Sequence, residues 1–216
     1  MPKTANPGRL EAFSDGVIAV IITIMVLDLK VPAEGGVAGL HAILPSVWLY
    51  ALSFTFTGVY WVNHHHLIHR TDQADESTLY ANLFFLFWLS LIPFGTSYVA
   101  AKKMDPFSVM LYIVMMIFAG GSFGLLRLVI GRHLRATGRL EKEDAAAERK
   151  HLISLGVYLV AVACSFRYPR VSLGIVTLIS VIWIIPSGRL HAVEYGVDAH
   201  ATTREGIREE QAGRLR

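Results

Sequence analysis

The chain has 216 residues, of which 53% are hydrophobic and only 17% are charged. This balance points to a polytopic membrane protein. The formal net charge of +3 is too small to make a nucleic-acid-binding surface, and the single cysteine, Cys164, excludes an intrachain disulfide.

The first membrane-spanning helix is predicted over residues 12–31. Between Ala12 and Leu27 the only charged residue is Asp15, and the apolar run that follows it is interrupted once, by Thr23. Twenty residues at about 1.5 Å per residue cross a hydrocarbon core of about 30 Å. A secretory signal would have a shorter apolar core and a small-residue cleavage site, so this helix is expected to stay in the membrane.

A helical wheel of about 100° per residue separates this segment into two faces. One face is a stripe of mostly bulky apolar residues, namely Phe13, Gly16, Val20, Ile24 and Leu27, with Thr23 at its edge. The opposite face holds Asp15, Ile18, Ile22, Met25 and Leu29. Periodicity alone leaves open whether the stripe faces lipid, another helix or a narrow pore.

An acidic residue near the end of a membrane helix is costly, and it marks either function or a polar network between helices. Asp15 follows Ser14, and Arg9 lies six residues earlier. The two side chains at 14 and 15 are suited to accept hydrogen bonds from free N–H groups at the start of the helix, with Arg9 balancing the charge. A simple helix cap with an arginine at the interface is the alternative.

Five further spans are predicted from the apolar runs, at residues 40–63, 79–101, 107–131, 151–168 and 171–189. Pro45 and Pro93 fall inside two of them and are expected to kink them. The predicted fold class is all-α, a polytopic membrane protein with six transmembrane helices per chain. These occupy residues 1–190, and 191–216 form a polar tail.

Two polar or small-residue features lie within these spans. Asn82 in the third span is expected to hydrogen-bond between helices. Gly120, Gly121 and Gly124 in the fourth span form a patch suited to close helix contact.

The positions of Lys and Arg predict the orientation. Most of them lie in the N-terminal segment, the 64–78 and 132–150 loops and the C-terminal segment, which share one side of the membrane. The positive-inside rule therefore predicts a multi-pass protein of the cell membrane with both termini in the cytoplasm.

Histidines cluster at the end of the second span, where Trp61 precedes His64, His65, His66 and His69. The remaining histidines are scattered singly, and no carboxylate or thiol stands at a closing spacing, so no metal site is expected. Trp61 and His65 are four residues apart and share a helix face. We expect Trp61 and one of His64, His65 and His66 to complete a polar network around Asp15 and Arg9, and the spacing favours His65. Interfacial aromatic and histidine side chains without such a network are the alternative.

Several functional motifs are absent from the sequence. It has no T-V-G-Y-G filter, no arginine repeat of a voltage sensor, no Gly-rich phosphate loop and no Ser/His/Asp hydrolase signature. No catalytic residues and no cofactor are therefore expected, and the protein is predicted not to be an enzyme.

The pattern Arg9-x-x-x-Phe13-Ser14-Asp15 at the start of a hydrophobic helix resembles the first-helix signature of the transmembrane protein 175 family. That family comprises lysosomal potassium channels and their prokaryotic homologues. The resemblance implies a potassium-preferring cation channel in which Trp and His from a later helix hold the first helix.

A single pore-facing helix cannot enclose a water path, so such a channel needs several subunits around a closed symmetry axis. The resemblance implies four, and hence a homotetramer in the lipid bilayer with monovalent cations, K⁺ above all, as the permeant partners. In this hypothesis Val20, Ile24 and Leu27 form stacked apolar constrictions that serve as gate and selectivity element, and Thr23 adds a layer of hydroxyls.

The alternative function is a proton- or ion-coupled secondary transporter. Such a protein would carry ionisable groups near the bilayer midplane and paired broken helices. Asp15 lies instead at a helix end, and the chain shows no inverted repeat.

Overall fold

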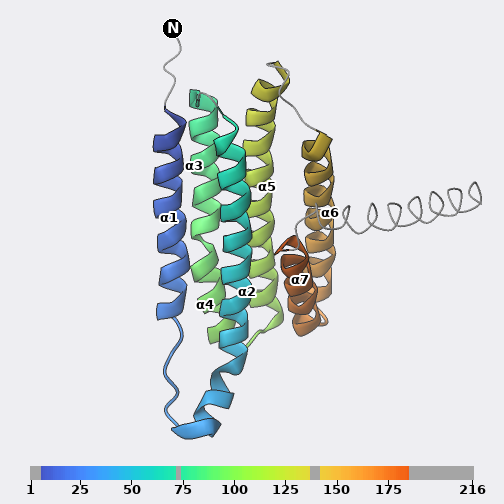
Figure 1. Cartoon of the computed structure of the whole chain (residues 1–216). Coiled ribbons are helices and arrows are strands. Elements are labelled where there is room, and N and C mark those ends of the chain that lie inside the picture. Colours follow the sequence, from blue (N-terminus) through green and yellow to red (C-terminus); the bar gives the residue numbers. More distant parts are fainter. Residues whose placement is uncertain (1–5, 72–73, 137–141, 185–216) are drawn as a thin grey trace, which may run out of the picture. The chain divides into compact units, whose positions relative to one another are not determined.

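The computed structural model describes residues 6–71, 74–136 and 142–184, where the regular elements are helices. Figure 1 shows them in chain order: α1 Pro7–Leu27, α2 Gly36–His69, α3 Glu76–Ser90, α4 Ile92–Ala101, α5 Pro106–Ala136, α6 Lys142–Ser165 and α7 Pro169–Ile184. The chain divides into two compact units, 1–180 and 181–216, and only 181–184 of the second are described. The predicted tail at 191–216 therefore lies outside the described residues.

These seven helices make six helical rods, because α3 and α4 continue one another across Leu91. Four rods are long and apolar enough to cross a membrane: Pro7–Leu27, Gly36–His69, Glu76–Ala101 and Pro106–Arg135. With α6 and α7, the described residues contain six rods. The prediction of an all-α membrane protein with six helices is confirmed.

Helix α1 begins five residues earlier than the sequence predicted. The Asn6 side chain caps it by accepting a hydrogen bond of 2.8 Å from the Gly8 N–H, and Pro7 occupies the first turn, where a missing N–H costs nothing. The helix ends at Leu27, where Asp28 is the C-cap. The hydrophobic run predicted the rod but not its polar first turn.

The two prolines inside predicted spans act differently. Pro93 lies in the first turn of α4, directly after the break that separates α3 from α4. Pro45 stays inside α2, whose N-terminal part runs at an angle to the rest of the helix (Figure 1). Both effects follow from the missing N–H and the bulk of the proline ring.

An aromatic cluster joins α2, α3 and α5 within the bundle. The ring centroids of Tyr60, Phe85 and Phe123 lie 5.2 to 5.8 Å apart, in tilted or edge-to-face pairs. All three side chains are buried. Such pairs each contribute about 1 kcal/mol beyond the burial of apolar area.

A buried group of hydroxyls joins α2, α4 and α5. The Ser53 Oγ lies 2.7 Å from both the Thr96 Oγ1 and the Tyr112 OH. These polar side chains satisfy one another away from water, which is the condition under which buried hydroxyls are tolerated.

A glycine in α5 leaves room for side chains from both α2 and α6. A Cβ atom at Gly120 would lie 2.8 Å from the Tyr60 OH and 2.9 Å from the Leu155 Cδ2, whereas one at Gly121 would meet nothing within 4 Å. At Gly124 a Cβ atom would lie 3.2 Å from the His151 Nε2. The predicted small-residue contact is therefore confirmed for Gly120 and Gly124, and Gly121 lies on the open side.

We expect Gly120→Ala to be less stable than Gly121→Ala by about 1–3 kcal/mol. Both changes remove the same backbone freedom, so the helix-propensity gain cancels between them and only the added contact at Gly120 remains. Thermal unfolding of the purified variants in one detergent measures the difference. Equal melting temperatures would contradict a tight fit of the Tyr60 and Leu155 side chains against Gly120.

Candidate functional site

Helix α1 has one face inside the bundle and one outside. The buried side chains recur every three or four residues: Leu10, Ser14, Ile18, Ile21 and Met25. They pack on α2, α3 and α4. Two of them, Ile18 and Met25, belong to the face that the helical wheel set opposite the stripe.

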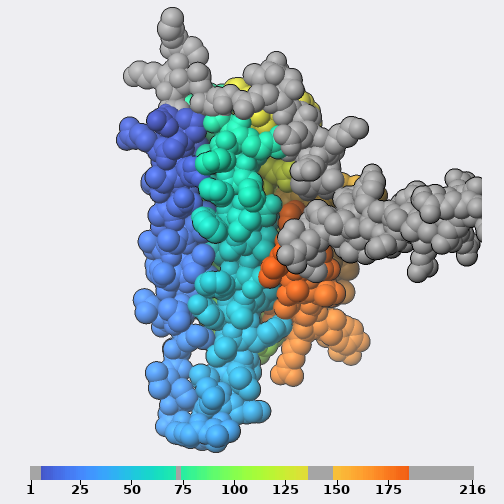
Figure 2. Space-filling model, viewed as in Figure 1, coloured from blue at the N-terminus to red at the C-terminus, as the bar shows by residue number. Residues whose placement is uncertain are grey.

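The predicted stripe lies on the outer face of α1. Val20 is 54% exposed, Ile24 45% and Leu27 80%, and Phe13 at the start of the stripe is 53% exposed. Figure 2 shows α1, in dark blue, lying open along one edge of the molecule. This row of bulky apolar side chains is therefore largely exposed in the single protomer.

A shallow groove of about 690 Å³ runs beside the stripe. Its second wall comes from the break between α3 and α4, where Ser90, Pro93 and Phe94 contribute. The groove is mostly apolar, so it offers a neighbouring apolar helix a surface in addition to the stripe.

Thr23 lies at the edge of the stripe and is exposed, but its hydroxyl is used within its own helix. The Oγ1 donates to the Ala19 carbonyl oxygen at 2.9 Å and also lies 3.1 Å from the Val20 carbonyl oxygen. The oxygen lone pairs remain open to a partner outside the protomer. At the same end of α1, Asp28 accepts a hydrogen bond from Ser97 of α4.

A chain of buried hydrogen bonds joins α1, α2 and α3 towards the other end of α1. The Ser14 Oγ–H donates to the Leu10 carbonyl oxygen at 2.8 Å. Its oxygen accepts from the Asn82 amide at 2.9 Å, and the Asn82 Oδ1 lies 2.7 Å from the His64 Nε2. All three side chains are buried, so the predicted interhelical role of Asn82 is confirmed.

The direction of this chain follows from its ends. Because the Ser14 hydroxyl proton is used by Leu10, its oxygen must accept from the Asn82 NH₂ group, which leaves the amide oxygen facing His64. The His64 Nε2 must then carry a proton and donate it to that oxygen. The His64 ring also stacks on Phe85, with centroids 5.8 Å apart.

Asp15 is held by Trp61 of α2. The indole Nε1–H donates to the Asp15 Oδ1 at 2.8 Å, a hydrogen bond to a charged acceptor. With the buried chain, this contact forms what we call the polar junction: Ser14, Asp15, Trp61, His64 and Asn82. It ties one end of α1 to α2 and α3.

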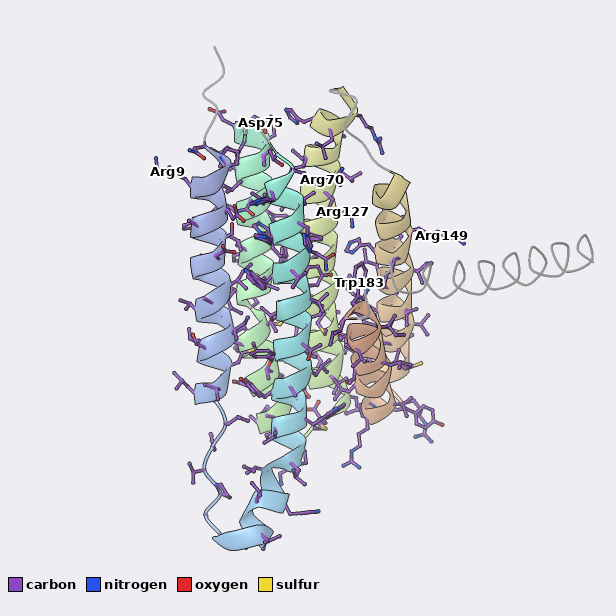
Figure 3. The ribbon with its side chains drawn as sticks, in the orientation of Figure 1. Arg9, Arg70, Asp75, Arg127, Arg149 and Trp183 are labelled. Atoms are coloured by element: carbon purple, nitrogen blue, oxygen red, sulfur yellow. The ribbon has the colours of Figure 1, made fainter. Side chains whose placement is uncertain are left out.

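Two residues predicted for this network lie elsewhere. The His65 Nδ1 faces Glu11 at 2.8 Å rather than Asp15. Arg9 is exposed and forms no ion pair with any residue in the described ranges. Figure 3 shows Arg9 at the N-terminal end of α1, pointing away from the bundle. The structure thus brings Ser14, Asp15 and Trp61 together but leaves Arg9 and His65 outside the junction.

The sequence left the choice among His64, His65 and His66 open and favoured His65, whereas the structure buries His64. A signal was present, because Phe56, Tyr60 and His64 follow one another at intervals of four and share the face of α2 that enters the core. The interval from Trp61 to His65 obeys the same rule. Spacing therefore does not tell which of the two faces enters the core; the burial of Phe56, Tyr60 and His64 in the structure does.

Asp75 lies in the connection at this same end of the bundle (Figure 3) and caps α3. The Thr78 hydroxyl, and then the Thr78 N–H, donate to its carboxylate at 2.7 and 2.8 Å, which lowers the pKa of Asp75. The stability that this cap contributes is present above the ordinary carboxyl pKa and is lost as the pH falls through the lowered one.

We expect Trp61→Phe to destabilise the protein by about 1 kcal/mol, because the ring stays in place while the donor to the Asp15 carboxylate is lost. Asp15→Ala, which removes the acceptor, should add little in the Trp61→Phe background, since the hydrogen bond is already gone. A double-mutant cycle of thermal unfolding measures this coupling. Additive effects of the two changes would show that the contact contributes nothing.

Comparison with known proteins places these features in a family. The model of the family described as "Endosomal/lysosomal potassium channel TMEM175" matches residues 9–93, which include α1 from Arg9 onwards, all of α2 and the polar junction. The chain is 42% identical to "Potassium channel HX13_20290" of Chryseobacterium sp. over 85% of this chain and 95% of that protein. It is 30% identical to "Potassium channel Cha6605_3372" of Chamaesiphon minutus over 86% of this chain and 97% of that protein.

A solved structure shares the fold. The crystal structure of a lysosomal potassium-selective channel TMEM175 homolog from Chamaesiphon minutus superposes with a TM-score of 0.72 at 29% identity. The match covers 82% of this chain and 96% of that one.

Proposed function

Because this chain belongs to the TMEM175 potassium channel family, we propose that it conducts K⁺ through a homotetramer whose pore is lined by α1. The observation that carries this proposal is the exposed apolar stripe of Val20, Ile24 and Leu27. Its rival, a proton- or ion-coupled transporter, has no ionisable midplane group on α1 to support it.

Four copies of α1 around a closed axis would bring these side chains together in rings. Each ring would narrow the path and expel water from it, which makes a barrier to a hydrated ion. An ion would pass only by shedding part of its hydration shell, and the larger potassium ion does so at lower cost than sodium. The apolar rings would thus act as both gate and selectivity element.

Thr23 would supply the polar contacts in this path. Its hydroxyl proton is directed to its own helix, so its oxygen lone pairs are the groups available to the ion. A layer of four such oxygens would replace part of the lost hydration between the apolar rings.

The polar junction would set how α1 moves. It fixes one end of α1 to α3 by a buried hydrogen bond and to α2 by the exposed one from Trp61 to Asp15. Leu27, at the other end, is the most exposed member of the stripe. Opening would then be a tilt of α1 about its anchored end. In this proposal the anchored end of α1 and both termini face the cytoplasm, and the excess of Lys and Arg on that side of the sequence supports it.

Bilayer recording of the purified protein in asymmetric KCl and NaCl tests the function. We expect unitary currents with a reversal potential displaced towards that of K⁺, and glutaraldehyde crosslinking that stops at four chains. Saturable flux without unitary currents would favour the transporter, and a reversal potential that ignores K⁺ would overturn the selectivity.

A further inference from the structure

A second group of polar side chains lies beside the polar junction, between the first part of α1 and the last turns of α2. It consists of Glu11, His65 and His69. The His65 Nδ1 lies 2.8 Å from the Glu11 Oε1, and the His69 Nδ1 lies 3.6 Å from the same oxygen. One possible ligand atom of each residue lies within 4.8 Å of the other two.

We propose that Glu11, His65 and His69 form a binding site for a divalent transition-metal ion such as Zn²⁺. Tetrahedral bonds of about 2.1 Å separate ligand atoms by about 3.4 Å. The His69–Glu11 distance of 3.6 Å already matches this value, and the His65–Glu11 distance need open by only about 0.6 Å.

The ligand types agree with this class of ion. His65 and His69 are four residues apart on one helix face, the spacing at which two imidazoles chelate zinc, and Glu11 supplies a carboxylate from the facing helix. Imidazole nitrogen favours zinc and its neighbours over magnesium or calcium. Glu11 lies far from these two histidines along the sequence, and it reaches them because α1 packs on α2.

Access and charge also suit a metal. The His69 side chain is 72% exposed, that of His65 41% and that of Glu11 19%, so an ion can enter from water and keep a water molecule as its fourth ligand. A single carboxylate and two neutral imidazoles leave the occupied site with one positive charge. Occupancy would clamp α1 to α2 at this end, next to the hydrogen bond from Trp61 to Asp15.

Metal titration of the full chain, purified without a histidine tag, tests the site. Isothermal calorimetry with ZnCl₂ is expected to give one ion per wild-type chain, and Co²⁺ should give the absorption bands of a tetrahedral complex. Glu11→Gln and His69→Ala should each weaken binding at least about tenfold. His66→Ala is the matched control, because His66 is an exposed neighbour outside the group, and it should bind as the wild type does.

A second measurement reports on the clamp. Zinc should raise the melting temperature of the wild type and of His66→Ala, and leave that of His69→Ala unchanged. His69 is exposed, so this variant is expected to fold. The proposal is overturned if the wild type binds no zinc up to about 1 mM, if His69→Ala binds it as tightly, or if His66→Ala loses as much affinity. In these cases the three side chains form a group of polar contacts that binds no metal ion.

Discussion

Truncating the stripe at Ile24 to alanine should raise K⁺ flux by about tenfold, which corresponds to about 1.4 kcal/mol at the barrier. The change removes three carbon atoms from each subunit at a proposed constriction, so the ring would widen and hold water more readily. Leu27→Ala should act in the same direction. Both should also reduce the preference for K⁺ over Na⁺, because ions would then shed less water.

Flux from proteoliposomes loaded with K⁺ or Na⁺ measures both quantities. Val26→Ala serves as the control, because Val26 is 45% exposed on α1, as Ile24 is, but faces away from the stripe. It should leave rate and selectivity at wild-type values. If Ile24→Ala and Leu27→Ala also do so, the stripe does not line the pore, and its exposure has another reason.

Asn82→Leu should destabilise the protein by about 2–4 kcal/mol and lower its melting temperature by roughly 5–10 °C. The substitution leaves the buried His64 Nε2–H without an acceptor and takes the donor from the Ser14 oxygen. A buried donor that loses its partner costs its full desolvation energy, and this cost outweighs the gain from burying a leucine. Weaker assembly is expected with it, since α1 loses its buried tie to α3.

Size-exclusion chromatography after a temperature series measures the loss. Asn63→Leu is the matched control, because the Asn63 amide donates only to the Val59 carbonyl of its own helix. It should cost less than about 1 kcal/mol. Adding His64→Phe to Asn82→Leu should restore part of the stability, since the orphaned donor disappears and the ring can still stack on Phe85. Equal effects of Asn82→Leu and Asn63→Leu would contradict the polar junction.

The fold was largely predictable because a bilayer permits few solutions. A segment must run for about 20 apolar residues and satisfy its own hydrogen bonds, so long apolar runs can be only helices. Pro93 predicted the break between α3 and α4, because a proline has no N–H to donate to the preceding turn. The start of α1 was less predictable, because its first turn is polar and depends on the Asn6 cap.

The candidate site was predictable in part. Helical periodicity separated the exposed members of α1, such as Val20 and Ile24, from buried ones such as Ile18. Trp61 was correctly associated with Asp15, since both lie near the same end of adjacent helices. His65 was preferred over His64 on its interval from Trp61, but that interval does not report which face of α2 enters the core.

By itself the sequence determined the six helical rods and the two faces of α1, because these depend on local periodicity and on the hydrocarbon core. Only the tertiary structure decided that His64 meets Asn82 and that His65 turns to Glu11. The physical reason is that a helix repeat relates residues within one rod, whereas a hydrogen bond between rods depends on their rotation and depth against one another. The packing of the whole bundle sets that rotation.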